Sequence, residues 1–331
     1  MRAVVVDQPG GIVALRLTEV PTPAPGPREV LIRIAASTVN WGDVQKRENI
    51  YPDPVAFPAI LGMEVAGIVG AVGSDVPETW IGRRVTALGG PRLVGGYAES
   101  ISVPLEYVLP LPDDIDWRTA AAFPLASLTA WHILRSAASV GPGDVVLIHA
   151  ISGSVGLALA QIADLYGAKV IGTVGDASKV DIATSAGAKL VIDRSRSDFA
   201  DEAMRFTSGR GVDLVVDSLG ASVLPHSFDA LRTYGRVINI GEAAGEPDFN
   251  VRKKLYERST SLSGFEVLHA IPGSERWQAG VDFLLAHLAD GSLRIPVGTT
   301  RPLENVAELH AAIAARGTTG KLVIDVDPSV N

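Results

Sequence analysis

Three small residues spaced three apart form the clearest chemical pattern in this chain. Ala150, Gly153 and Gly156 follow an apolar run at 145–148 and lead into a helical pattern at 155–166. Small residues in such a turn let the backbone approach a pyrophosphate, and the start of the helix offers unpaired N–H groups and a partial positive charge. The spacing therefore predicts that this turn binds a dinucleotide.

The segments around the turn must hold it in place. The run at 145–148 is rich in β-branched residues and predicts a strand buried on both faces, and Gly167 ends the helix before a second buried strand at 169–174. Further helices are expected at 177–185, 199–207 and 223–231, and further strands at 190–192, 212–216 and 236–240. This alternation predicts an α/β fold with an open, doubly wound parallel sheet of the Rossmann type.

The remainder of the chain has a different pattern. Residues before about 112 are rich in Pro and Gly and read as short strands without regular helices, and a helical stretch at 120–138 leads into the sheet. Beyond residue 265, two helices near 277–289 and 303–315 precede a last strand at 321–326. We expect this tail to return to the first domain. The predicted organisation is a mostly β domain, residues 1–124 and 266–331, split around a nucleotide-binding domain, residues 125–265, with the active site in the cleft between them.

The composition narrows the functional classes. At 331 residues, 47% of them hydrophobic, the chain is long enough for two domains with sizeable cores. A formal charge of −8 without a basic block argues against a nucleic-acid partner, and the lack of Cys excludes disulfides and thiolate metal sites. The segment MRAVVVDQPGG does not read as a signal peptide, and no apolar run reaches the ~18 residues of a membrane span, so we expect a cytoplasmic protein without a membrane partner.

Several further motifs give the chain a family resemblance. They are Asn40-Trp41-Gly42-Asp43, Pro58-x3-Gly62-x-Glu64-x2-Gly67, Gly96-Tyr97-Ala98-Glu99, Leu128-Thr129-Ala130, the turn at 150–156 and Gly320-Lys321. With them the chain resembles, over nearly its whole length, the zinc-independent quinone oxidoreductase and enoyl reductase branch of the medium-chain dehydrogenases. The resemblance implies a GroES-like catalytic domain split around the Rossmann domain, NADPH as hydride donor, and a homodimer. It also implies a set of cofactor-binding residues: Asn40, Thr129, Ser152, Gly153, Ser154, Val155, Val174, Lys179, Arg194, Gly241, Phe265 and Lys321.

The choice of coenzyme can be examined at the end of the second strand. An NAD enzyme places a carboxylate there for the ribose hydroxyls, about 20 residues after the turn. This strand ends with Val174, and Asp176 reads as a helix cap. In the resembling reductases a Lys at the position of Lys179 contacts the 2′-phosphate, whereas Arg194 replaces a frequent aromatic residue. Both cations either bind the phosphate or are solvated surface residues. Ser154, a second departure, either contacts phosphate or caps the helix.

One motif indicates whether the chain can bind a catalytic zinc ion. In the zinc alcohol dehydrogenases of this superfamily, a Cys and a Gly-His-Glu motif supply catalytic ligands, but here Met63 stands between Gly62 and Glu64. A neutral thioether is a poor zinc ligand. The six His residues lack ligand spacing and are expected to be structural. We predict no metal, and we expect Glu64 to pair with an arginine.

The implied chemistry is hydride transfer from a nicotinamide to a quinone or to the β-carbon of an enone. The developing enolate needs a hydrogen-bond donor, and the α-carbon needs a proton. Tyr51 and Asn40 are the catalytic candidates, although Tyr51 is equally a wall residue if water delivers the proton, and Asn40 is equally an orienter of the nicotinamide. Asp43 is expected to buttress this loop. Trp41, Tyr51 and Trp131 are the predicted substrate-pocket residues, with Phe265 as a further candidate.

The predicted function is that of an NADPH-dependent, zinc-free reductase of quinones or α,β-unsaturated carbonyls, acting on a small molecule. One alternative is an enoyl-thioester reductase of fatty-acid or polyketide synthesis, for which the basic run at 252–254 would contact the carrier. A second is a zinc alcohol dehydrogenase, which the missing ligands nearly exclude. A third, of another class, is a non-catalytic NADPH-binding sensor or structural protein. The sequence does not name the substrate.

Overall fold

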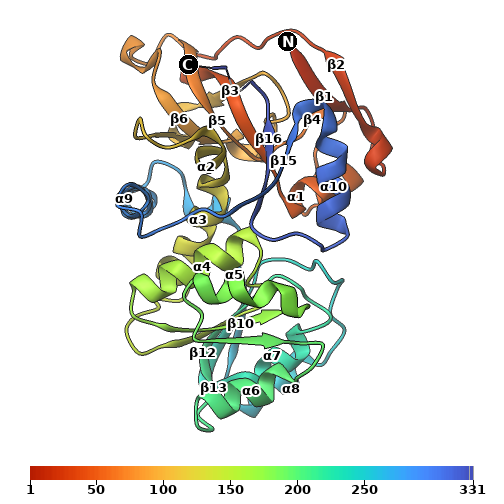
Figure 1. The fold of residues 1–331 in the computed structure, drawn as a ribbon, viewed down its shortest axis with the longest axis vertical. Coiled ribbons are helices and arrows are strands. Elements are labelled where there is room, and N and C mark those ends of the chain that lie inside the picture. Colours follow the sequence, from red (N-terminus) through yellow and green to blue (C-terminus); the bar gives the residue numbers. More distant parts are fainter. Residues whose placement is uncertain (328, 331) are drawn as a thin grey trace. The chain divides into compact units, whose positions relative to one another are not determined.

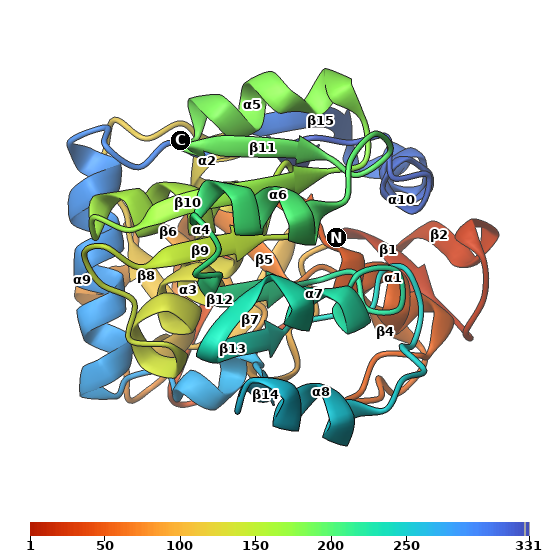
Figure 2. The same ribbon diagram turned by 90° about the horizontal axis from the view of Figure 1, so that it is seen from below.

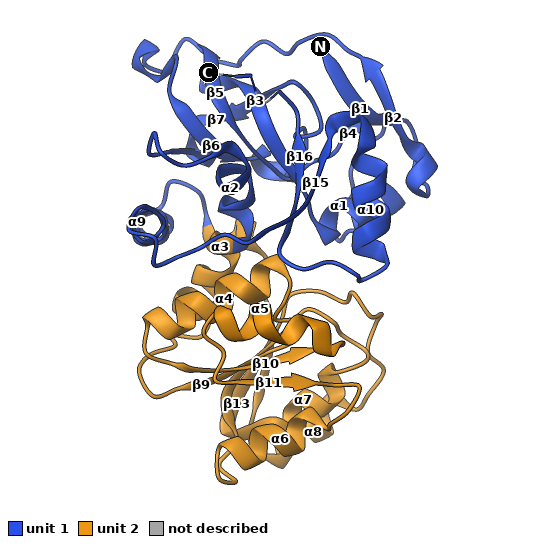
Figure 3. Cartoon of the chain, viewed as in Figure 1, with its two compact units in different colours: residues 1–126, 271–331 blue, residues 127–270 orange. Residues whose placement is uncertain are grey.

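The computed structural model describes residues 1–327 and 329–330, and it divides the chain into two compact units (Figure 3). Unit 1 comprises Met1–Ala126 and Ile271–Asn331, and unit 2 comprises Ser127–Ala270. The sequence predicts two divisions at nearby positions, after residues 124 and 265.

Unit 2 is built on a parallel sheet of six strands in the order β11-β10-β9-β12-β13-β14, which can be followed in Figure 2. The strands are β9 (Val145–Ile148), β10 (Lys169–Val174), β11 (Leu190–Asp193), β12 (Val212–Asp217), β13 (Leu231–Asn239) and β14 (Ser261–Gly264). Every residue of β9 is buried, because the strand lies in the middle of the sheet with a layer of helices on each face. The doubly wound sheet predicted from the sequence is therefore confirmed.

Helices cover both faces of this sheet. Their bounds are α3 (Pro124–His132), α4 (Ser154–Leu165), α5 (Val180–Ser185), α6 (Phe199–Phe206), α7 (Leu224–Ala230) and α8 (Val251–Glu257), with a π-helical turn at Ile133–Ala137 after α3. Figure 1 shows α4 and α5 on one face and α6, α7 and α8 on the other. The predicted helix at 120–138 is in fact three segments, the first of which, α2 (Trp117–Ala122), belongs to unit 1.

Unit 1 is mostly β. Its strands are β1 (Arg2–Val6), β2 (Leu15–Glu19), β3 (Glu29–Val39), β4 (Ala59–Ile60), β5 (Glu64–Val72), β6 (Arg84–Leu88), β7 (Ser100–Pro104), β8 (Val108–Pro110), β15 (Val297–Pro302) and β16 (Lys321–Asp325). One sheet has the order β2-β1-β4, and the other has the order β15-β16-β3-β5-β6-β8, with β7 also paired to β3. The C-terminal tail returns as predicted, because β16 pairs antiparallel with β3, with Leu322 opposite Val39.

Within the described residues of unit 1, these sheets are accompanied by α1 (Trp41–Glu48), α2, α9 (Glu275–Ala289) and α10 (Val306–Ala314). The sequence did not predict α1, and the reason is physical. Its buried face consists of Asp43, Val44, Lys46 and Arg47, so the apolar periodicity that marks most helices is absent. Within residues 1–327 and 329–330, no helix is long and apolar enough to cross a bilayer.

Candidate active site and coenzyme site

The loop that enters α1 is fixed by a buried carboxylate. Asp43 accepts hydrogen bonds from the backbone N–H groups of Asn40 and Gly62, both at 2.9 Å. Burial raises the pKa of Asp43 to about 6, against the opposing effect of these two hydrogen bonds. The carboxylate thus ties the first turn of α1 to the Gly62 turn before β5, and the predicted buttressing role of Asp43 is confirmed.

A buried ion pair holds the side chain of Asn40. Lys321 on β16 forms an ion pair with Glu64 on β5, and their side chains are 2% and 0% exposed. The same ammonium donates to Asn40 Oδ1 at 2.5 Å, while Asn40 Nδ2 lies 3.3 Å from Glu64 Oε1. These contacts orient the amide. They correct one expectation, because Glu64 pairs with a lysine and not with an arginine. The ammonium of Lys321 is directed at Glu64 and Asn40, and its predicted contact with the coenzyme stays a prediction.

A second polar network braces the other side of α1. The Tyr97 hydroxyl lies 2.9 Å from His310 Nε2 on α10, and His310 Nδ1 lies 3.0 Å from Arg47 Nη1. Burial, and then the nearby Asp43 carboxylate, raise the pKa of Tyr97. Burial, with the nearby Arg47 charge, lowers the pKa of His310 to about 3, so this imidazole is neutral at physiological pH. His310 is structural, as expected, and α1 is held at both ends of its buried face.

Tyr51 follows α1 and packs back against it. Its ring lies 4.6 Å from Lys46 Nζ in a cation–π contact. A Cβ added at Gly42 would meet the Tyr51 ring at 3.2 Å and the Met63 thioether at 3.0 Å, so all three residues are in close contact. The structure therefore places both catalytic candidates, Asn40 and Tyr51, against the first turn of α1. Trp41, the first residue of α1, has a buried Nε1 without a hydrogen-bond partner in the structure.

Met63 stands between Gly62 and Glu64, where the resemblance described above implies a histidine ligand in zinc alcohol dehydrogenases. It is 3% exposed and packs against Gly42. The neighbouring carboxylate of Glu64 is engaged by Lys321, Thr38 and the backbone N–H of Leu125. Over residues 1–327 and 329–330, no group of three or more His, Cys, Asp and Glu side chains is arranged to hold a metal ion.

The small-residue turn of unit 2 is as tight as its composition indicates. Ala150 has φ +49°, and a Cβ at Gly156 would lie only 2.6 Å from Ile151 Cα. Gly156 therefore allows α4 to approach the turn, whereas Gly153 has room, since the nearest atom to its Cβ would be 3.4 Å away. α4 begins at Ser154, with Gly153 at the N-cap and no side-chain cap. The alternative that Ser154 caps the helix is wrong. Its N–H lies in the first turn of α4, where an anion is favoured.

Two of the predicted cations follow the adjacent strands β10 and β11. The backbone N–H of Arg194 donates to Val174 O at 3.0 Å, and its Nη1 donates to Thr173 Oγ1 at 2.7 Å. Lys179 ends the short 3₁₀ turn Ala177–Lys179 after β10. Asp176 caps that turn by accepting from the Ser178 N–H, which confirms the predicted capping role. Hydrogen bonding by the side chain and then the backbone of Ser178 lowers the pKa of Asp176.

Four further predicted residues lie at different places in unit 2. Gly241 and Phe265 follow β13 and β14, where Asn239 links them through its side-chain donation to Gly241 O and its carbonyl to Phe265 N. Gly241 and Phe265 therefore lie at the carboxyl edge of the parallel sheet, the same edge as the small-residue turn at 150–156. Trp131 differs. It is 4% exposed and donates to the hydroxyl of Tyr166, which caps the far end of α4. Within unit 2 it therefore packs at the end of α4 opposite the turn, and its predicted role in the substrate pocket stays a prediction. Thr129 is half-buried on α3.

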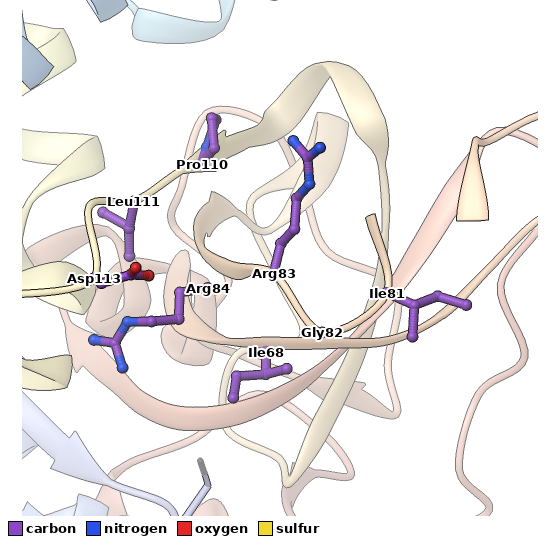
Figure 4. A pocket seen from close by; sticks show the side chains of 8 residues that line it. All are labelled: Ile68, Ile81, Gly82, Arg83, Arg84, Pro110, Leu111 and Asp113. Carbon is purple, nitrogen blue, oxygen red and sulfur yellow. The ribbon is translucent and has the colours of Figure 1, made fainter. Parts of the chain in front are cut away.

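A hollow of about 600 Å³ on unit 1 contains none of the predicted site residues (Figure 4). It is lined by residues of β5, of β6 and the segment before it, and of the end of β8 and the segment after it: Ile68, Ile81, Gly82, Arg83, Arg84, Pro110, Leu111 and Asp113. Arg84 lies over the Trp117 ring at 3.6 Å. This hollow is separate from the Asn40 and Tyr51 cluster of the same unit.

Comparison with known proteins decides the family. Residues 26–113 match the alcohol dehydrogenase GroES-like domain, and residues 154–286 match the zinc-binding dehydrogenase domain. A quinone oxidoreductase of Pseudomonas aeruginosa is 35% identical over 95% of this chain and 96% of its own length. A quinone oxidoreductase of Escherichia coli, solved with NADPH, superposes with a TM-score of 0.91 at 28% identity, covering 98% of this chain and 100% of that one.

The chain belongs to the quinone oxidoreductase family of medium-chain dehydrogenases. Another relative is a much longer protein. It is a phenolphthiocerol/phthiocerol polyketide synthase component of Mycobacterium tuberculosis, 33% identical over 97% of this chain, which spans 14% of that protein.

Sequence reasoning missed several residues that hold the site of this quinone oxidoreductase homologue. Thr38 donates to Glu64 at 2.6 Å, and Lys46 lies over the Tyr51 ring. In unit 2, Thr173 contacts Arg194 directly, and His149 contacts it through Thr173. The sequence feature that could have indicated these residues is a polar residue inside an otherwise apolar strand or at its end, such as Thr173 in β10. That signal marks a buried partner but does not identify it.

Proposed function

We propose that this chain is an NADPH-dependent, zinc-free oxidoreductase that delivers hydride to a quinone or an α,β-unsaturated carbonyl. The observation that carries the proposal is the position of Arg194. Its guanidinium is hydrogen-bonded at the end of β10, where an NAD enzyme has a carboxylate. The relatives named quinone oxidoreductase, one of them solved with NADPH, support the same reading.

On this proposal Arg194 and Lys179 bind the 2′-phosphate of the coenzyme. Val174 is buried and apolar, so no carboxylate at the last position of β10 repels the phosphate. Asp176 and Asp193 lie nearby, but each is turned into its own local backbone, by Ser178 N–H and Ser195 N–H respectively. An arginine fork suits a phosphate because it presents two parallel donors.

When bound, the nicotinamide supplies the hydride. The protein's part is to orient the reactants and to place donors where charge develops. Asn40 is suited to this because Lys321 and Glu64 fix both ends of its amide. Tyr51, packed against Gly42, is the proposed proton donor, and the Lys46 ammonium over its ring favours the build-up of negative charge on its oxygen.

No metal enters this proposal. Met63 stands in place of the histidine of the Gly-His-Glu motif, and the carboxylate of Glu64 is paired with Lys321. Neither position therefore offers a zinc ligand. Elemental analysis of the purified protein should find no stoichiometric zinc, and chelators should leave activity intact. One zinc per chain, with activity lost on chelation, would contradict this part.

An enoyl-thioester reductase is the second candidate, favoured by the similarity to a polyketide synthase. Its acyl carrier would need a basic patch. The run at 252–254 lies on α8, where Lys254 pairs with Asp229 at 2.6 Å and Arg252 stacks on Tyr256 at 5.1 Å. Because these two cations already have local partners, the run offers a weaker patch than its sequence indicates, and free quinones or enones are the preferred substrates.

Binding titrations test the coenzyme assignment. Arg194→Ala and Lys179→Ala should each weaken NADPH binding about tenfold to over a hundredfold, because a charge-assisted contact contributes about 1.5–3 kcal/mol, and should leave NADH nearly unchanged. Arg196→Ala is the matched control. Its side chain is 75% exposed and lies 3.4 Å from Asp193, so the same charge is removed two residues away. Equal binding of NADH and NADPH by the wild type would refute the assignment.

Turnover separates the enzyme from a non-catalytic NADPH-binding protein. NADPH should be consumed with at least one member of a panel of quinones, enones and enoyl thioesters, measured by loss of nicotinamide absorbance. The proposal extends to a cytoplasmic homodimer, which light scattering and cell fractionation would check. NADPH binding without turnover of any panel member would favour the sensor.

A further inference from the structure

Arg194 is the first member of a continuous chain of hydrogen bonds that runs into unit 2. Its Nη1 donates to Thr173 Oγ1 at 2.7 Å, and that hydroxyl lies 2.9 Å from His149 Nδ1. His149 Nε2 lies 3.0 Å from Ser227 Oγ on α7, which in turn donates to Val223 O at 3.0 Å. Thr173, His149 and Ser227 are 0%, 2% and 0% exposed, so the chain is inside the protein.

The hydrogens in this chain can be placed by counting donors. Ser227 has one hydroxyl hydrogen and gives it to Val223 O, so it must accept from His149 Nε2–H. A neutral imidazole then has Nδ1 as an acceptor, and the Thr173 hydroxyl must donate to it. Thr173 Oγ1 is left with lone pairs, and these accept from Arg194. The opposite tautomer would leave the hydroxyl hydrogen of Thr173 without an acceptor in this chain.

His149 can keep this role over the physiological pH range because it stays neutral. Burial, together with the charge of Arg194, lowers its pKa to about 3. The ring is also held edge-on by Phe199, with centroids 4.7 Å apart. Thr173, the acceptor that faces Arg194, is the last residue but one of β10 and is therefore fixed both by the strand and by His149.

We propose that Thr173 and His149 are positioning residues that set the preference for a 2′-phosphorylated coenzyme by holding the guanidinium of Arg194 at the end of β10. The inference rests on the proposed function, in which Arg194 binds that phosphate. An arginine side chain loses much rotamer freedom when it binds an anion, and this loss of entropy weakens binding. Because the hydrogen bond to Thr173, which His149 holds in turn, already fixes the Arg194 side chain, part of that entropy is lost before the coenzyme binds. Neither Thr173 nor His149 needs to touch the coenzyme.

The test uses Thr173→Val, which keeps the shape of the side chain and removes the hydroxyl. NADPH affinity should fall about three- to tenfold, the range of one hydrogen bond, and NADH affinity should stay within about twofold. Thr173→Ser restores the hydroxyl and should restore NADPH affinity. In an Arg194→Ala background, Thr173→Val should have no further effect. Titrations with 2′,5′-ADP and ADP should show the same selectivity, because they probe the adenosine half alone.

The outcomes distinguish failure of this inference from failure of the proposed function. Equal weakening of NADPH and NADH by Thr173→Val would mean general damage to the fold and would overturn the inference, as would unchanged NADPH binding. If Arg194→Ala abolishes the NADPH preference but Thr173→Val does not, the proposed function stands and this inference fails. If Arg194→Ala leaves the preference intact, both fail. Should Thr173→Val not fold, His149→Phe, which removes the acceptor behind Thr173, should show the same selective loss with NADPH.

Discussion

Lys321→Met is predicted to destabilise the protein far more than an average surface substitution. The substitution keeps the length and apolar stem of the side chain but removes the ammonium from a site that is 2% exposed. Glu64, at 0% exposed, then keeps its charge with three neutral partners: Thr38 Oγ1, Asn40 Nδ2 and the Leu125 N–H. Breaking a buried ion pair by removing one partner costs about 3–5 kcal/mol, since an uncompensated charge remains.

Urea unfolding followed by tryptophan fluorescence would measure this cost. Four of the five tryptophans (Trp41, Trp80, Trp117 and Trp277) lie in unit 1 with the ion pair, so the signal reports mainly on that unit. The free energy of unfolding should fall by about 3–5 kcal/mol in Lys321→Met, and the double variant Glu64→Gln/Lys321→Met should recover most of the loss, because no charge is then buried unpaired. A loss below about 1 kcal/mol, or a double variant no more stable than the single one, would refute the reasoning.

Three other predictions follow from the same structure. Tyr51→Phe should slow single-turnover reduction of an enone by about 10²–10⁴-fold if its hydroxyl is the acid, and should affect a quinone less, because the reduced quinone is protonated readily from solvent; equal enone rates would make Tyr51 a wall residue. His310 has a folded pKa of about 3, below the ordinary value of 6.5, so between these pH values the unfolded chain binds a proton that the folded chain does not. The free energy of unfolding therefore falls as the pH drops below about 6.5, by up to about 1.4 kcal/mol per pH unit. In urea titrations at several pH values, the stability of His310→Gln should fall less steeply with acid than that of the wild type. Parallel plots of stability against pH for the two proteins would contradict this. Gly156→Ala should weaken NADPH and NADH binding alike and lower the melting temperature, because its Cβ would lie 2.6 Å from Ile151 Cα, whereas Gly153→Ala, with 3.4 Å to the nearest atom, should be milder; the reverse order would count against the packing argument.

The elements that the sequence predicted well are those in which one local signal dominates. β10 was predicted at Lys169–Val174, the bounds that the structure has, because an apolar run between Gly167 and Gly175 suits a strand with helices on both sides. The turn at 150–156 was equally clear. By contrast, α1 was missed because its buried face carries Asp43, Lys46 and Arg47, which read as solvent-facing residues in any pattern of hydropathy.

The ion-pair and hydrogen-bond partners of buried polar residues could not be predicted from the sequence, for a different reason. Lys321 reaches Glu64 because β16 pairs with β3 and β3 pairs with β5, and no local pattern encodes that strand order. Glu64 was therefore given an arginine as its expected partner. Likewise, the sequence did not indicate that Trp131 donates a hydrogen bond to Tyr166 at the far end of α4. Residue type indicated that a partner was needed, and only the topology identified it.

The central claim, that this chain transfers hydride from NADPH to an electron-poor acceptor, is tested most directly with coenzyme deuterated at the transferring C4 position. A single turnover with an α,β-unsaturated ketone should place the deuterium on the β-carbon of the product, as read by mass spectrometry and NMR, and the same protein should transfer it from NADPH far more readily than from NADH. A reduced product without deuterium at that carbon, or no reduction of any quinone or enone by protein saturated with NADPH, would contradict the account.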